Sequence, residues 1–86
     1  MTFRTAVFEA AKRSPKLSAA NRRKLATIEE RANRHKRFWA AAENLVAAKY
    51  ERETGKKVKD WKEILDWLIA NLPAILQIIM AILALF

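Results

Sequence analysis

The chain has 86 residues, of which 52% are hydrophobic and 30% are charged, and its formal net charge is +8. A chain of this length forms at most one small domain with a modest core. It has no cysteine and only one glycine, which excludes disulfide bonds, thiolate metal sites and glycine-rich phosphate loops. Paired catalytic carboxylates and nucleophile elbows are absent as well. We therefore expect a protein that is not an enzyme and has no cofactor.

The charges are segregated along the chain. Residues 1–37 contain eleven Lys or Arg and three Glu, residues 38–66 contain six charges of each sign, and residues 67–86 contain none. A basic block followed by a neutral middle and an apolar tail suits a protein that bridges a polyanion and an apolar environment. We divide the chain into a basic helical region, 1–55, and a region 56–86 with an amphipathic turn and an apolar helix.

The sequence predicts a short helix over residues 2–13, capped by Thr2. Its apolar face is formed by Phe3, Val7 and Ala10. Ser14-Pro15 ends this helix, because proline disfavours helical geometry in the residue before it. We do not expect this segment to be a signal peptide, since Arg4 and Glu9 lie where a signal peptide has its continuous apolar region. Ser18 is placed to cap the next helix.

One long helix is predicted from Ala19 to about Glu53, because this stretch has no glycine or proline and many strong helix formers. A heptad-like seam runs along it and comprises Leu25, Ile28, Ala32, His35, Trp39, Ala42 and Val46. Gly55 follows as the left-handed residue that ends the helix. His35 has no Cys, Asp or Glu at ligand spacing, so we expect a packed residue and no metal site.

The face opposite the seam carries the candidate phosphate-binding residues, which are Arg22, Arg23, Lys24, Arg31, Arg34, Lys36 and Arg37. Clustered basic residues on a helix bind nucleic acid phosphates or the anionic headgroups of a membrane. A third interpretation is a solvated face that keeps an apolar protein soluble. Helix-turn-helix spacing, a zinc motif and an RNA-binding aromatic signature are missing, so base-specific recognition is not expected.

A third helix is predicted from Asp60 to Phe86, beginning with the capping box formed by Asp60 and Glu63. Its last twenty residues, Trp67–Phe86, carry no charge and would span roughly 30 Å, which is the thickness of a bilayer core. Trp61 and Trp67 would lie at one headgroup level and Phe86 at the other. The lysines at 56, 57, 59 and 62 would place the N-terminal side in the cytoplasm. The alternative is a core helix buried in a soluble oligomer.

A stripe of small or polar residues runs along this third helix. Besides Lys62 it comprises the candidate self-association residues Asp66, Ala70, Pro73, Gln77, Met80 and Ala84. Small residues let helices approach closely in lipid, and amide side chains hydrogen-bond between them. We expect self-association through this stripe, with Asp66 and Gln77 able to line a water-filled lumen. The alternative is that the stripe docks on the chain's own long helix.

The predicted fold is therefore all-α, with a short helix, a long basic amphipathic helix and an apolar, membrane-spanning helix that assemble as a helical oligomer. The expected function is that of a membrane-associated assembly protein without a small-molecule substrate, located in a membrane with its N-terminus cytoplasmic or within a virion. This layout resembles that of small basic phage proteins with one apolar helix, such as holin-like proteins and virion components. The alternatives are a soluble helical subunit of a larger complex and a nucleic-acid packaging protein.

Overall fold

The structure is a computed structural model that describes residues 1–15, 17–32 and 34–86. It contains the helices α1 (Phe3–Lys12), α2 (Ala19–Ala32), α3 (Lys36–Thr54) and α4 (Leu65–Leu83). A short 3₁₀ turn, η1 (Trp61–Ile64), leads directly into α4. The described ranges contain no β-strand, and the all-α prediction is confirmed.

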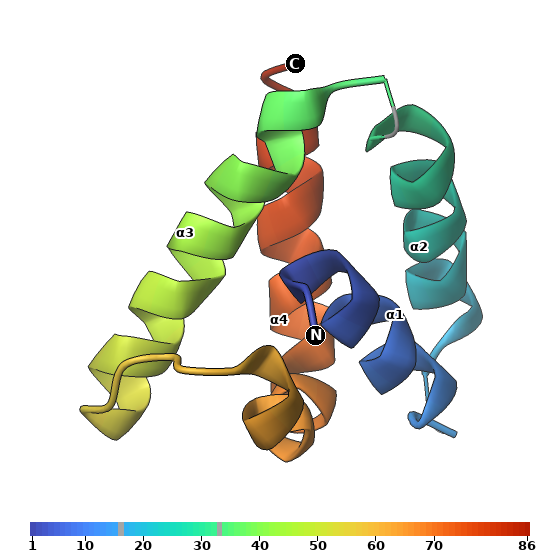
Figure 1. The fold of residues 1–86 in the computed structure, drawn as a ribbon. Helices are drawn as coiled ribbons and strands as arrows, with labels where there is room; N and C mark the ends of the chain where they lie inside the picture. Colours follow the sequence, from blue (N-terminus) through green and yellow to red (C-terminus); the bar gives the residue numbers. More distant parts are fainter. Residues whose placement is uncertain (16, 33) are drawn as a thin grey trace.

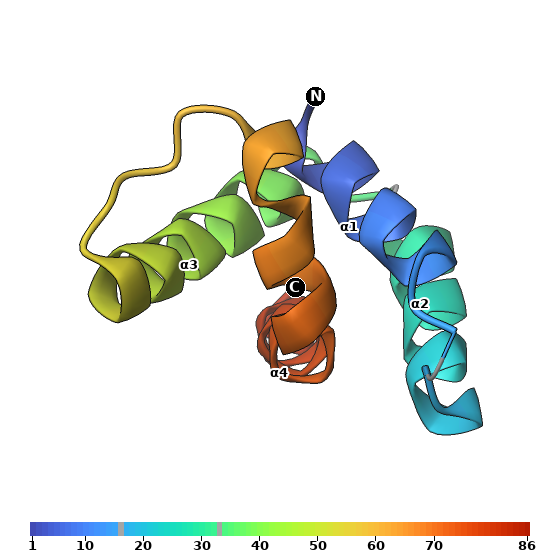
Figure 2. The same ribbon diagram turned by 90° about the horizontal axis from the view of Figure 1, so that it is seen from below.

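Helix α4 is the centre of the fold. Figure 1 shows α3 on one side of α4, α2 on the other and α1 crossing in front of it, and α4 contacts all three helices and η1. Seen from below, α2 and α3 spread to either side of α4 (Figure 2). Regions 1–55 and 56–86 thus contribute to one hydrophobic core.

The predicted helix ends are confirmed where a local side chain or a glycine defines them. The Thr5 amide donates to Thr2 Oγ1 (3.2 Å), and the Asn21 amide donates to Ser18 Oγ (3.1 Å). At the predicted capping box the outcome differs. Asp60 Oδ1 accepts from the Lys62 amide (3.1 Å), while the Glu63 amide donates to the Asp60 carbonyl, so Asp60 starts the 3₁₀ turn η1 and the α-helix begins at Leu65. Gly55 has a φ of 72° and ends α3 in the left-handed conformation.

The prediction of one long helix from Ala19 to Glu53 is wrong. Helix α2 ends at Ala32, and α3 begins at Lys36 after His35, which has extended backbone angles. An unbroken helix of this length would measure roughly 50 Å, whereas the longest dimension of the molecule is 31 Å. The break lets α2 and α3 both pack on α4.

The seam predicted along the long helix is buried within the single chain, despite the break. Its buried members are Leu25, Ile28, Ala32, Ala42 and Val46, and His35 and Trp39 are partly buried. In α1, Ala6 and Ala10 are fully buried, and their small side chains allow a short distance between α1 and α4. Helix α4 continues through Pro73 and ends at Leu83, three residues before the predicted end at Phe86.

Candidate functional site

The two faces of α4 have different environments. One face packs into the core and comprises Leu65, Leu68, Leu72, Ile75, Leu76, Ile79, Ile82 and Leu83. The predicted self-association stripe lies on the other face, where Asp66, Ala70, Pro73, Gln77 and Ala84 are exposed and Met80 is partly buried. No helix lies over the lower side of α4 in Figure 2. The chain's own helices therefore do not cover the stripe, in contrast to the alternative in which the stripe docks on the long helix.

The apolar segment Trp61–Leu83 is long and apolar enough to cross a membrane, and it is the one such helix in the described parts of the chain. The core helix of a soluble protein can have the same length and apolar composition. Eight Leu and Ile side chains of α4 are buried in the core that α1, α2 and α3 also form, so this segment is both apolar enough to span a bilayer and packed as a core helix.

The aromatic residues predicted for the membrane interface have three different surroundings. Trp61 is only 5% exposed, its Nε1 donates to Glu43 Oε1 (2.9 Å), and its ring centroid lies 4.7 Å from that of Phe3. Trp67 is half-buried with its ring 5.1 Å from Tyr50. Phe86 is 48% exposed. In this structure Trp61 is thus a core residue rather than a surface anchor.

The predicted phosphate-binding residues lie on α2, on the start of α3 and in the segment between them. Arg22, Arg23, Arg31, Arg34 and Arg37 are exposed and Lys24 is partly buried, while the side chain of Lys36 lies outside the described residues. In the described part of the molecule, ion pairs join Arg13 to Glu9, Lys49 to Glu53 and the Met1 amine to Asp60. None of these pairs neutralises the predicted phosphate-binding residues. Because the helix is broken, these residues do not form one continuous helical face.

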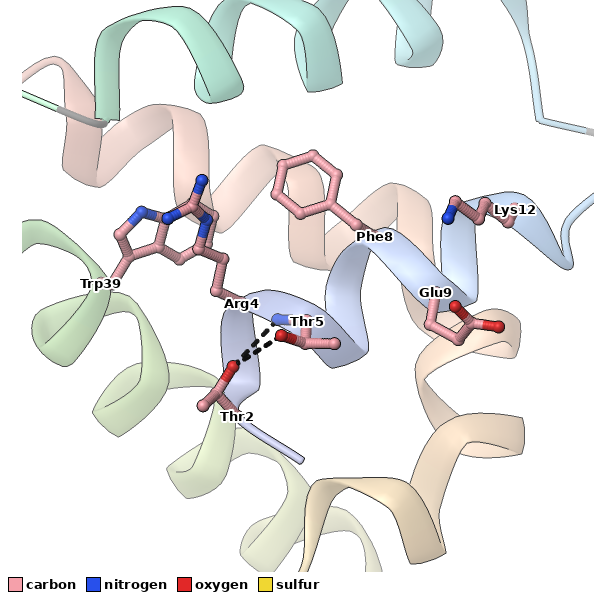
Figure 3. A pocket seen from close by; sticks show the side chains of 7 residues that line it. All are labelled: Thr2, Arg4, Thr5, Phe8, Glu9, Lys12 and Trp39. Carbon is pink, nitrogen blue, oxygen red and sulfur yellow. Dashed lines mark hydrogen bonds between the residues drawn. The ribbon is translucent and has the colours of Figure 1, made fainter.

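A pocket of about 600 Å³, which the sequence did not predict, lies between α1 and α3. It is lined by Thr2, Arg4, Thr5, Phe8, Glu9, Lys12 and Trp39 (Figure 3). The Arg4 guanidinium carbon lies 5.9 Å from the centroid of the Trp39 ring, within range of a cation–π interaction. The Phe8 and Trp39 centroids are 6.1 Å apart. Arg4, Phe8 and Lys12 recur every four residues, which was the available signal, but their contact with Trp39 arises only from the fold.

The balance of charge in this pocket is positive. Figure 3 shows Arg4 and Phe8 on one side of α1, with the Lys12 ammonium directed back toward Phe8 and the Glu9 carboxylate pointing away. Glu9 accepts from Arg13 Nε at 3.3 Å, so its charge is compensated outside the cluster. Trp39 Nε1 is buried and has no hydrogen-bond partner among the described residues. The pocket thus combines two cations and two aromatic rings, and the indole N–H of one ring is buried without a partner among the described residues.

In the described ranges, no group of three His, Cys, Asp or Glu side chains lies close enough together to hold a metal ion. His35, the only histidine, has its ring 5.7 Å from that of Phe86. Comparison of the chain with protein-family models, with curated proteins and with solved structures gave no significant match.

Proposed function

We propose that this protein is a non-enzymatic, membrane-associated assembly protein. Its basic helices bind anionic phosphate at the membrane surface, and α4 inserts into lipid and self-associates through the exposed stripe. The observation that carries this proposal is the two-sided character of α4. The helix is apolar enough to cross a bilayer, yet its small and polar residues stay uncovered while its Leu and Ile face is packed. A holin-like or virion component is one setting for such a protein.

This arrangement suggests three steps, in which the protein is soluble in water, is attracted to an anionic membrane surface and then inserts α4. In water, α1, α2 and α3 cover the apolar face of α4 and the exposed arginines keep the molecule soluble. At an anionic surface each nearby basic residue contributes about 1 kcal/mol of attraction. Inserting α4 then exchanges its contacts with α1–α3 for contacts with lipid. The partition of the native protein between buffer and anionic vesicles, followed by carbonate extraction, tests this function.

Binding to anionic vesicles should weaken steeply as salt is added, because salt screens exposed charges. Replacing Arg31, Arg34 and Arg37 by Gln should weaken binding and reduce its salt dependence. On duplex DNA the salt slope should fall by about 0.9 for each lost contact. The same three positions changed to Lys keep the charge and provide the control. Binding that does not respond to salt would remove phosphate as the partner of these residues.

Self-association should depend on the exposed stripe of α4. Gln77→Leu removes an interhelical hydrogen bond and should weaken association in detergent by about 1 kcal/mol per helix. Ala84→Leu should weaken it by steric separation. Leu45→Ala, at an exposed position on α3, is the control. Chemical crosslinking and analytical ultracentrifugation measure the oligomer. An oligomer that is unchanged by both stripe substitutions would show that the contact lies elsewhere.

A second candidate function is supported by the packing of α4. Because its Leu and Ile face is already buried within the chain, the protein can also serve as a soluble helical subunit of a larger complex. The exposed stripe would then contact another protein rather than a lipid-embedded copy. Carbonate extraction distinguishes the two functions, since a soluble subunit stays in the supernatant. Binding to DNA but not to vesicles would favour the third alternative, nucleic-acid packaging.

A further inference from the structure

We propose that the pocket formed by Arg4, Phe8, Lys12 and Trp39 binds the phosphate headgroup of an anionic phospholipid. This inference rests on the proposed membrane function and assigns a specific contact to a part of the molecule that the sequence analysis did not use. The predicted phosphate-binding residues lie between Arg22 and Arg37, whereas this pocket is built mainly by α1.

The cations of the pocket are available to an anion. Arg4 and Lys12 are exposed, and the nearest carboxylate, Glu9, points away from them and pairs with Arg13 (Figure 3). Their attachment points are eight residues apart on α1, which is about 12 Å along the helix axis. Both side chains are long and flexible, so their heads can converge on a phosphate held above Phe8. A guanidinium also offers two parallel N–H donors to phosphate oxygens.

The aromatic wall completes the binding chemistry. The Arg4 guanidinium lies over Trp39, whose buried Nε1 has no partner in the described structure. A phosphate bound at the pocket gives the Arg4 guanidinium a stronger partner than the ring offers, and it changes the surroundings of the Trp39 ring. The Trp39 indole N–H therefore gives a direct spectroscopic signal of binding at the pocket.

The composition of the pocket favours a lipid over a nucleic acid. Phe8 lies between the two cations and is only partly buried, so the pocket offers an apolar ring beside its positive charges, as a lipid with an anionic headgroup and apolar chains requires. Helix α1 also packs directly against α4, the candidate span. Before insertion, a headgroup held on α1 therefore lies next to the helix that is proposed to enter the bilayer. Duplex DNA, in contrast, is bound by a longer series of phosphate contacts.

The first test uses soluble glycerol phosphate and the indole N–H signals in a ¹H–¹⁵N spectrum of the native protein, assigned with Trp39→Phe. The Trp39 signal should move on titration. The Trp61 signal should stay, because its N–H is held by Glu43. A Trp39 signal that does not move, or equal movement of all the indole signals, would overturn the site.

The second test compares binding to vesicles of equal parts phosphatidylglycerol and phosphatidylcholine. Arg4→Gln/Lys12→Gln should bind roughly 30-fold more weakly than the native protein, from the attraction of two basic residues at an anionic surface. Both positions are exposed and Gln is a good helix former, so α1 should remain folded. The matched control Lys49→Gln/Arg52→Gln removes the same charge from the C-terminal half of α3. Its loss should stay within about threefold, because charges beyond roughly 8 Å from the lipid are screened.

The results of these two tests distinguish a failure of the proposed pocket from a failure of the proposed membrane function. If the native protein binds vesicles and both double variants lose affinity equally, attraction is diffuse and the pocket is not a site, while the membrane function stands. If the native protein does not bind vesicles but glycerol phosphate moves the Trp39 signal, the pocket binds free phosphate. Both the lipid assignment and the proposed membrane function are then wrong. If the pocket variant loses binding to duplex DNA but not to vesicles, the lipid assignment is wrong.

Discussion

Gln77→Arg should abolish insertion of α4 while leaving the water-soluble fold intact. Gln77 is exposed, so a charge there stays hydrated in the closed molecule, where surface substitutions change stability by only about 0.5 kcal/mol. It also lies at the middle of the uncharged stretch Trp67–Phe86. An arginine at the centre of a membrane helix costs about 2.5–3.5 kcal/mol on insertion scales, which corresponds to a roughly 100-fold smaller inserted fraction.

The measurement is the fraction of protein that resists carbonate extraction from anionic vesicles, alongside circular dichroism in buffer. Gln77→Leu is the matched control, since it changes the same side chain and should insert at least as well as the native protein. Ile79→Arg would be uninformative, because Ile79 is fully buried and a charge there disrupts the core in any environment. If Gln77→Arg resists carbonate extraction as fully as the native protein, residue 77 does not face lipid at the centre of the bilayer.

Leu76→Ala should lower the free energy of unfolding in buffer by about 2–5 kcal/mol, the range for a buried leucine truncated to alanine. Leu76 is 0% exposed and belongs to the face of α4 that packs into the core. Natural domains have total stabilities of only about 5–15 kcal/mol, so a small domain such as this one would lose a large share. The midpoint of urea unfolding, followed by circular dichroism, reports the change.

The control is Leu85→Ala, which makes the same truncation at a position that is 86% exposed. It should change the free energy of unfolding by less than about 0.5 kcal/mol. The pair tests whether α4 is the core of a folded protein in water or an apolar helix that finds its partners only in lipid. Equal effects at the two positions, or no cooperative transition in buffer, would contradict the packed arrangement.

The features that sequence predicted correctly depend on neighbouring residues. Thr2 and Ser18 accept hydrogen bonds from amides three residues ahead, and Gly55 takes a left-handed conformation that few other residues adopt. Helical periodicity also separates the two faces of α4, but within the chain the Leu and Ile face packs against other helices and the stripe through Gln77, predicted to be the contact face, is exposed. Such features are encoded within one or two helical turns.

The features that sequence did not predict depend on the tertiary fold. The residues from Ala19 to Glu53 have strong helix propensity, but the break after Ala32 is favoured by contacts with α4, which lies far away in sequence. Propensity is a weak prior that packing overrides. In the same way, the four-residue spacing of Arg4, Phe8 and Lys12 is visible in sequence, whereas Trp39 joins them only because α3 returns beside α1.

The central position of α4 has a consequence for synthesis of the chain. The ribosome makes α1, α2 and α3 first, at about 5–20 residues per second, and the helix on which all three pack is made last. The apolar faces of the earlier helices have no partner during that interval of several seconds. Their closure also requires contacts between distant residues, which are slow to form. Nascent molecules of this protein thus expose apolar surface to chaperones or membranes, and the chain meets its cellular surroundings before its own core is complete.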